Sequence, residues 1–379
     1  MIKKILLILL SISLCSSAFA KKKEKEFEFN TKKFKKQNTK VLKKLWSKSL
    51  KNGKPSKRYY PESSNPTLEN DIIYVGTHGK VFYAVSTSTG KIIWEYKNDE
   101  PIASTASTNT QNVFFTDLGG HIICLNKQSG SLVWKNYFGD ELLGRPLVDK
   151  NSLYLLKGER EIISVSTSSG QIKWNKSIQT YIRDITMNGH ASFIKDQNSL
   201  YLGLADGRLY RLNASNGNTM WVKNLTMPLR IFKDIDATVV VNGDSLYVGG
   251  YFGAFYRIKK SNGSITWLSE VATGFPPLIL DDLVVLSDIN GTIYGIDKQD
   301  GKQLWFNELE SGVLSAPAEY DNKIFVSTFK KDAYLINPDT GYQIQKISLG
   351  QGAITQPISA NKKLYVLTND AKLMALGAY

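Results

Sequence analysis

The sequence predicts an all-β fold, an eight-bladed β-propeller with four-stranded blades. Six times a glycine is followed four residues later by a tryptophan, at intervals of 38 to 47 residues, and these pairs contain six of the seven tryptophans. A fixed period near 40 residues is typical of a repeat architecture. Each period holds short runs of β-branched and aromatic residues, and no window after the first twenty residues has a convincing helical period, which favours the blade of a propeller. The pairs are Gly90 and Trp94, Gly130 and Trp134, Gly170 and Trp174, Gly217 and Trp221, Gly263 and Trp267, and Gly301 and Trp305.

One repeat illustrates how the residues specify the blade. Residues 206–213 alternate polar and apolar side chains, which predicts a strand, and residues 199–203 form the strand before it. The Ser-Asn-Gly cluster that follows is a turn in which Gly217 supplies a positive φ. The strand after the turn carries Trp221. Because six tryptophans occupy one repeat position, we expect each ring to pack against a neighbouring blade rather than to stack on a ligand.

The two ends of the chain predict how the propeller closes. Gly341 is followed by Gln345 where a tryptophan is expected, so one docking ring is missing. Residues 364–367 and 372–376 form later strands, and the chain stops before another Gly-x-x-x-Trp segment. Residues 44–47 supply the missing strand from the N-terminal side. We therefore expect this strand to complete the last blade, giving seven full repeats and one split between the termini, with no free sheet edge at the junction.

The domain organisation follows from composition. Residues 1–20 are predicted to be an export signal, residues 21–44 a basic flexible tether, and residues 45–379 the propeller. Lys3 and Lys4 precede an apolar run of about ten residues, which is too short to span a bilayer. An Ala-x-Ala sequence ending at Ala20 fits the small-x-small rule for signal cleavage.

Cys15 gives a second interpretation of the same segment. A cysteine directly after the apolar run is lipidated in bacterial lipoproteins, but the residue before it here is Leu14, where a small residue is normal. Both interpretations place the mature protein outside the cytoplasm. If Cys15 is removed or lipidated, Cys124 has no internal disulfide partner, and its apolar strand predicts a buried, inert thiol.

The net charge of +14 is concentrated near the N-terminus. Residues 21–58 hold 16 Lys and Arg against three Glu, whereas residues 59–379 hold 30 Lys and Arg against 31 Asp and Glu. The body of the protein is thus nearly neutral, and no nucleic-acid partner is predicted. We expect the basic segment to be a solvated tether, with contact to anionic lipid as the alternative.

The sequence predicts no catalytic centre, metal site or cofactor. It lacks a Gly-x-Ser-x-Gly elbow, a phosphate-binding loop, a dinucleotide fingerprint and a His/Cys cluster with metal spacing. The three histidines are scattered over separate repeats, and His78 and His121 are expected to be exposed turn residues. Four aspartates are interpreted as turn caps that recur at one repeat position: Asp117, Asp206, Asp288 and Asp370.

The repeat is longest in two consecutive places. The intervals between successive tryptophans from Trp94 onward are 40, 40, 47, 46 and 38 residues, so extra residues follow Trp174 and Trp221. Insertions at equivalent places in neighbouring blades emerge side by side on one face. They hold residues 180–184 and 228–236, in which apolar side chains alternate with Arg and Asp, as in protein-binding patches. Alternatively, the loops fold on themselves, with Arg183 paired to an aspartate of the second loop.

The repeat resembles the pyrroloquinoline-quinone (PQQ) enzyme-repeat family, whose blades carry an Ala-x-Asp-x-x-Thr-Gly-x-x-x-Trp pattern, matched here at residues 84–94 with Ser86 in place of the Asp. The resemblance covers almost the whole chain from residue 45 onward and implies the propeller fold. Quinoprotein dehydrogenases of that family use adjacent cysteines and a calcium site near the cofactor, and they are usually much longer. This chain has no adjacent cysteines, so the propeller is expected to be non-catalytic.

The exported propeller with its closing N-terminal strand also resembles the BamB family, accessory subunits of the outer-membrane β-barrel assembly machinery. That resemblance implies a non-enzymatic periplasmic scaffold associated with the outer membrane, held at its inner leaflet if Cys15 is lipidated. It implies binding to the POTRA domains of BamA and assistance to nascent outer-membrane proteins. By the same resemblance the partner-binding residues are Ile182, Arg183, Asp234 and Asp236, and residues 239–243 also fit the family pattern. Two alternatives remain open, a small PQQ-dependent quinoprotein and a generic periplasmic binding propeller with another partner.

Overall fold

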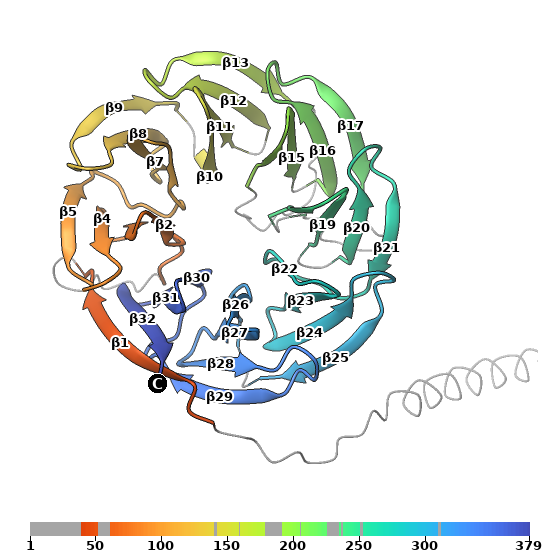
Figure 1. Cartoon of the computed structure of the whole chain (residues 1–379). Coiled ribbons are helices and arrows are strands. Elements are labelled where there is room, and N and C mark those ends of the chain that lie inside the picture. The colour runs from red at the N-terminus through yellow and green to blue at the C-terminus, as the bar shows by residue number, and fades with distance from the viewer. Residues whose placement is uncertain are drawn as a thin grey trace, which may run out of the picture. The chain divides into compact units, whose positions relative to one another are not determined.

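The computed structural model confirms the eight-bladed propeller (Figure 1). It describes residues 39–51, 61–139, 142–158, 160–178, 192–204, 206–225, 235, 238–250, 253–309 and 312–379. Throughout these ranges the regular structure is β-strand, in eight four-stranded antiparallel sheets. None of these residues belongs to a helix long and apolar enough to cross a membrane.

Each sheet is one blade, and its strands follow one another outward from the propeller axis (Figure 1). Blades 1 to 4 consist of β2 (Thr67–Glu69), β3 (Ile72–Gly76), β4 (Val81–Ser86) and β5 (Ile92–Lys97); β6 (Ser107–Thr108), β7 (Asn112–Thr116), β8 (His121–Asn126) and β9 (Leu132–Tyr137); β10 (Leu142–Asp149), β11 (Ser152–Lys157), β12 (Glu161–Ser166) and β13 (Ile172–Ser177); and β14 (Ile194–Asp196), β15 (Ser199–Gly203), β16 (Arg208–Asn213) and β17 (Thr219–Asn224).

Blades 5 to 8 repeat this plan. They consist of β18 (Val240–Asn242), β19 (Ser245–Val248), β20 (Phe255–Lys259) and β21 (Ile265–Ser269); β22 (Leu278–Ile279), β23 (Leu283–Ser287), β24 (Thr292–Asp297) and β25 (Gln303–Glu308); β26 (Ala318–Tyr320), β27 (Lys323–Ser327), β28 (Asp332–Ile336) and β29 (Gln343–Ser348); and β30 (Ile358–Ala360), β31 (Lys363–Leu367), β32 (Lys372–Ala378) and β1 (Leu42–Ser49).

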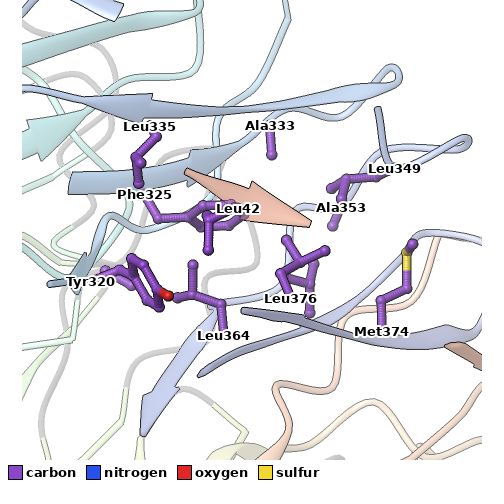
Figure 2. Packing of buried hydrophobic residues seen from close by; sticks show 12 residues of the cluster. Leu42, Tyr320, Phe325, Ala333, Leu335, Leu349, Ala353, Leu364, Met374 and Leu376 are labelled. Carbon is purple, nitrogen blue, oxygen red and sulfur yellow. The ribbon is translucent and has the colours of Figure 1, made fainter. Parts of the chain in front are cut away.

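Blade 8 is closed by the N-terminal strand, as the sequence predicts. β1 pairs antiparallel with β32, from Leu42 opposite Ala378 to Ser49 opposite Lys372. The strand begins at Leu42, so residues 42–44 belong to the blade and not to the tether that was assigned to residues 21–44. The physical reason is burial: the Leu42 side chain is only 2% exposed. Figure 2 shows it enclosed by Phe325 of blade 7 and by residues of blade 8 such as Leu364.

The repeated glycine and tryptophan meet across seven of the eight blade junctions. The indole ring of Trp94 lies over the turn glycine of the next blade, Gly130, where an added Cβ would come within 2.5 Å of the ring. Gly130 also has a φ of 72°, a conformation that favours glycine. The same contact joins Gly90 to Trp46, Gly170 to Trp134, Gly217 to Trp174, Gly263 to Trp221, Gly301 to Trp267 and Gly341 to Trp305. The prediction that the rings dock on neighbouring blades is therefore confirmed.

Gln345, which replaces the seventh tryptophan of the repeat, holds the closing strand. Its Oε1 accepts hydrogen bonds from the backbone N–H groups of Val41 (2.9 Å) and Leu42 (2.7 Å). Its Nε2 donates to the Leu42 carbonyl at 2.8 Å, and the side chain is only 6% exposed. An indole, which only donates, could not satisfy these groups. The repeat therefore departs from its pattern where a second chain terminus enters the sheet.

A salt bridge joins the chain just after β1 to blade 8. The Lys51 ammonium lies 3.1 Å from the Asp370 carboxylate, and the Thr368 hydroxyl donates to the same carboxylate at 2.6 Å. Burial alone would raise the pKa of Asp370, but the Thr368 hydroxyl and the Lys51 charge outweigh it, so the pKa is lowered. A carboxyl whose pKa is lowered by folding stabilises the fold above its unfolded pKa, and this contribution is lost as pH falls through the folded value.

Asp370→Asn is therefore expected to reduce stability at pH 7 and to be close to neutral at a pH below the folded pKa. The reduction should not exceed about 1 kcal/mol, because Lys51 is half exposed and solvent screens the pair. Urea unfolding at both pH values measures the difference. Asp339→Asn, at an exposed turn, is the control, and an equal loss in both variants at pH 7 would show that the salt bridge contributes nothing.

Candidate partner-binding face

One face of the propeller carries the connections between blades, and we call it the connection face. On this face the residue after the outermost strand is hydrogen-bonded, in seven blades, to the turn between the second and third strands of its own blade. Phe138 donates to the Gly120 carbonyl, Ile178 to the Arg160 carbonyl, and Leu225 to the Gly207 carbonyl, at distances of 3.0, 2.8 and 2.9 Å. The connection then returns over this face to the innermost strand of the next blade.

Several connections between blades are fixed at one more point, which we call the anchor. The anchor N–H donates to a carbonyl of the same turn between the second and third strands. In the connection from blade 1 to blade 2, the anchor is Ile102. Its N–H donates to the Thr77 carbonyl of blade 1 at 3.1 Å, and its side chain is fully buried. The other anchors with this bond are Ile235 to Leu204, Thr273 to Gly250, Leu314 to Asp288 and Ala353 to Thr328. At these crossings a backbone group of the connection thereby finds its hydrogen-bond partner.

The anchor shows where the second long connection carries its extra residues. From Leu349 to the anchor Ala353 there are four residue steps, whereas from Leu225 to the anchor Ile235 there are ten. From the anchor to the next innermost strand both connections take five steps, from Ala353 to Ile358 and from Ile235 to Val240. The insertion therefore lies wholly between Leu225 and Ile235.

Ile235 is held firmly at the base of this insertion. Its side chain is 4% exposed and packs in the core between blades 4 and 5 with Leu225 and Val239. An added Cβ on Gly203 would meet both its side chain and its carbonyl at 2.7 Å. Only glycine in the strand leaves room for this close approach.

The predicted partner-binding residues Ile182, Arg183, Asp234 and Asp236 lie outside the described residues, as does Cys15. The ends of their two connections are described. The first leaves from Ile178 and returns at Phe193, both buried. The second leaves from Leu225 and contains the anchor Ile235, so Asp234 and Asp236 are the two neighbours of a buried residue. Both connections therefore start and end on the connection face, at the neighbouring junctions between blades 3 and 4 and blades 4 and 5.

Sequence reasoning missed a third long connection. It runs from Leu50 after β1 to β2, and residues 52–60 within it are outside the described part of the chain. The signal was available, because Trp46 and Trp94 are 48 residues apart, more than any of the other intervals. This connection joins blade 8 to blade 1, across the axis from the junction between blades 4 and 5 (Figure 1).

The four turn aspartates occupy two positions, so the prediction of one repeat position is wrong. Asp117 and Asp288 stand first in their turns, and Asp206 and Asp370 stand two residues later, as the closing bonds of these turns show. The capping role holds for three of them. Asp117 Oδ1 accepts from the N–H groups of Gly119 and His121, Asp288 Oδ1 from those of Asn290 and Thr292, and Asp206 Oδ1 from that of Arg208.

Asp206 lies in the turn that receives the anchor of the second long connection, and its pKa is shifted. Burial raises its pKa, and the backbone N–H and guanidinium of Arg208 offset part of this effect. Its carboxylate also accepts a hydrogen bond from the Tyr210 hydroxyl at 3.2 Å. These bonds shape the turn whose Leu204 carbonyl receives the anchor Ile235, so the carboxylate has a structural role in positioning the connection.

His78 and His121 are not the exposed turn residues that the sequence predicts. Their side chains are 21% and 25% exposed, and each lies beside a buried carboxylate. His121 Nδ1 is 3.1 Å from Asp117, and His78 Nδ1 is 3.5 Å from Glu62. The carboxylates also accept backbone N–H groups of the turns, so each imidazole closes a polar cluster against the blade. His190 lies outside the described residues.

The described ranges contain no group of three or more His, Cys, Asp and Glu side chains that could hold a metal ion. Cys124 is a free, fully buried thiol, and burial raises its pKa to about 12. A thiol that stays protonated is a poor nucleophile. The prediction of a buried, inert cysteine is therefore confirmed.

These features define a class of protein, an eight-bladed propeller of PQQ-type repeats whose connection face bears inserted loops. The family model described as "Outer membrane protein assembly factor BamB" matches residues 43–113, 103–307 and 289–378. The chain therefore belongs to the BamB family.

Individual relatives agree with this assignment. Outer membrane protein assembly factor BamB of Shewanella oneidensis is 24% identical over 349 residues, which cover 86% of this chain and 87% of the relative. The crystal structure of BamB from Moraxella catarrhalis superposes with a TM-score of 0.78 at 19% identity, over 89% of this chain and all of that one, and supports the fold. Quinoprotein ethanol dehydrogenase of Pseudomonas putida is 26% identical over 133 residues, only 32% of this chain and 21% of the enzyme.

Proposed function

We propose that the protein is a non-enzymatic periplasmic scaffold of the outer-membrane β-barrel assembly complex, associated with the outer membrane. It would bind BamA-like POTRA domains and assist the insertion of nascent outer-membrane proteins. Family membership supports the role, and the BamB relative matches along most of its length whereas the dehydrogenase matches over a fifth. The absence of adjacent cysteines from the sequence favours a scaffold over a quinoprotein.

The single observation that carries the site is the placement of the two insertions. Their described ends lie on one face at neighbouring blade junctions, from Ile178 to Phe193 and from Leu225 to Val239. In the proposal Arg183 makes charge-assisted hydrogen bonds to the partner, and Ile182 supplies apolar contact area. Asp234 and Asp236 pair with basic groups of the partner or brace the loop.

The test is a binding titration of the purified protein with a BamA POTRA fragment. Arg183→Glu is expected to reduce the affinity at least about 30-fold, because a charge-assisted hydrogen bond worth about 2 kcal/mol is replaced by repulsion. Its melting temperature should stay unchanged. Lys91→Glu makes the same charge reversal at an exposed turn between β4 and β5, on the face opposite the insertions, and should bind like the wild type.

Two results would overturn the proposal at different points. Wild-type affinity in Arg183→Glu would remove the site and leave the partner intact. If the wild type itself fails to bind POTRA domains, and a quinone absorbance appears after addition of PQQ and calcium, the scaffold role is wrong and the quinoprotein alternative replaces it. Cleavage at Ala20 or lipidation of Cys15 is decided by the mass of the mature protein.

A further inference from the structure

Polar residues stand in or just before the innermost strand, at equivalent positions, in five consecutive blades, from blade 8 to blade 4. These residues are Gln356, Asn65, Thr105, Arg145 and Ser192. At each of three junctions the backbone N–H of one member donates to the side chain of the next. Gln356 donates to Asn65 Oδ1 (2.7 Å), Asn65 to Thr105 Oγ1 (3.2 Å), and Arg145 to Ser192 Oγ (3.2 Å).

Arg145 interrupts this pattern. A guanidinium has five donors and no acceptor, so Arg145 cannot receive the N–H of Thr105 as the other members receive theirs. Among the described residues the Thr105 N–H has no hydrogen-bond acceptor. The Thr105 oxygen already accepts the bond from Asn65. At the junction of blades 2 and 3 the Thr105 N–H and the Arg145 guanidinium are therefore both donors, and neither can accept from the other.

The guanidinium is held in a defined orientation. Its Nε donates to Ser107 Oγ at 2.8 Å, and the Ser107 hydroxyl in turn donates to the Pro146 carbonyl. Ser107 is 3% exposed, so this support is rigid. Arg145 itself sits in a bulge of β10, beside Gly144 with a φ of 72°. The bond at Nε leaves the two terminal nitrogens, Nη1 and Nη2, free to act as a fork.

The charge on Arg145 is not compensated by a neighbour. No carboxylate of the described residues lies within ion-pair distance of the guanidinium, and burial lowers its pKa. Arg145 is nevertheless an exposed residue, so protein groups surround the guanidinium without covering it. An unpaired cation beside a second unpaired donor favours an oxyanion.

We propose that Arg145 and the Thr105 N–H form a binding site for a small oxyanion, a carboxylate or a phosphate, at the junction of blades 2 and 3. Two oxygens of the ligand would accept from Nη1 and Nη2, and one of them would also accept from the Thr105 N–H. The site lies where the innermost strands start, hence toward the connection face. It is independent of the POTRA-binding role proposed above.

The test measures the melting temperature of the mature full-length protein during titration with sodium phosphate and, separately, sodium succinate. Sodium chloride keeps the ionic strength constant. A saturable rise beyond that with chloride is expected in the wild type, and its midpoint gives the affinity. If only phosphate gives a saturable rise, the ligand of the site is a phosphate group. If only succinate does, the ligand is a carboxylate.

Arg145→Gln should lower the affinity at least about tenfold, as expected for the loss of a charge-assisted bond. Arg257→Gln is the matched control, because Arg257 makes the same Nε bond to a serine, Ser245 (2.9 Å), while its Nη1 is already bonded to the Lys298 carbonyl. It should titrate like the wild type. If Arg145→Gln does not fold, Arg145→Lys takes its place and should bind more weakly than the wild type, because an ammonium lacks the fork.

The proposal is overturned by any of three results. The wild type could show no saturable rise beyond the effect of chloride. The midpoint of Arg145→Gln could equal that of the wild type. Arg145→Lys could bind as tightly as the wild type, which would exclude recognition by the guanidinium fork.

Discussion

Trp94→Ala is expected to lower the free energy of unfolding by about 3–5 kcal/mol, the range for removing a large buried aromatic side chain. The ring is 9% exposed, lies 5.9 Å from Tyr74 and 6.1 Å from Phe82 between ring centroids, and its Nε1 donates to the Lys127 carbonyl at 3.1 Å. Its removal leaves a cavity at the junction between blades 1 and 2, where a rigid turn cannot collapse to fill it. Chemical denaturation measures the loss.

Ile93→Ala is the matched control for this prediction. Ile93 is the preceding residue of β5 and is 49% exposed on the outer rim, so its truncation should change stability by no more than about 0.5 kcal/mol. Comparable losses in both variants would mean that the strand, and not the docked ring, is what the substitutions disturb.

The contact between Trp94 and Gly130 can be isolated by a double-mutant cycle. Gly130→Ala combines backbone strain at a φ of 72° with a clash against the ring at 2.5 Å. In the Trp94→Ala background only the strain remains, so the alanine should cost less there. A coupling energy of zero would show that Gly130 is required only for the conformation of its turn, and not for the contact with Trp94.

Gln345→Leu is expected to destabilise the protein by about 3 kcal/mol, at roughly 1 kcal/mol for each of three hydrogen bonds. Leucine has a similar volume but leaves two backbone N–H groups, of Val41 and Leu42, and the Leu42 carbonyl without their partner. Because these bonds hold the strand that closes blade 8, unfolding should also begin at the N-terminal strand. Hydrogen exchange at the amides of β1 would report this local opening.

Gln303→Leu, at an exposed position of β25, controls for the change in composition and should be near neutral. Gln345→Trp restores the repeat pattern, yet it should be destabilising as well, because an indole offers no acceptor to Val41 and Leu42. An unfolding midpoint of Gln345→Trp equal to or above that of the wild type would contradict the assigned role of Gln345.

The sequence located the long connections of blades 3 to 5 correctly but not their detail. Intervals of 47 and 46 residues identified them, because insertions change the distance between repeated tryptophans. The intervals could not show that Ile235, which stands between Asp234 and Asp236, is buried. Its burial depends on close packing against the backbone of Gly203 in β15. The interval before Trp94 holds a third long connection, which the spacing of the complete repeats does not include because β1 precedes the first of them.

Predictions about single polar residues were less successful than those about the repeat. His78 and His121 stand in turns, and turn residues are commonly exposed, but Glu62 and Asp117 draw both rings against the blade. Asp117 and Asp206 look equivalent in sequence and are two positions apart in the turn. Turn register depends on which carbonyl closes the turn, a property that residue type alone does not specify.

The sequence by itself determined the blade number, the four-stranded plan, the closure by the N-terminal strand and the buried thiol of Cys124. The blade number and the four-stranded plan depend on a local pattern repeated many times, so that irregular copies do not obscure the period. The closure and the buried thiol follow from short apolar strands that can be recognised locally. Only the tertiary structure decided three features: the hydrogen bonds of Gln345 to Val41 and Leu42, the anchor at Ile235, and the unpaired donors at Arg145. These arise between residues from different blades, up to 304 positions apart, and such contacts exist only after the chain has closed into a ring.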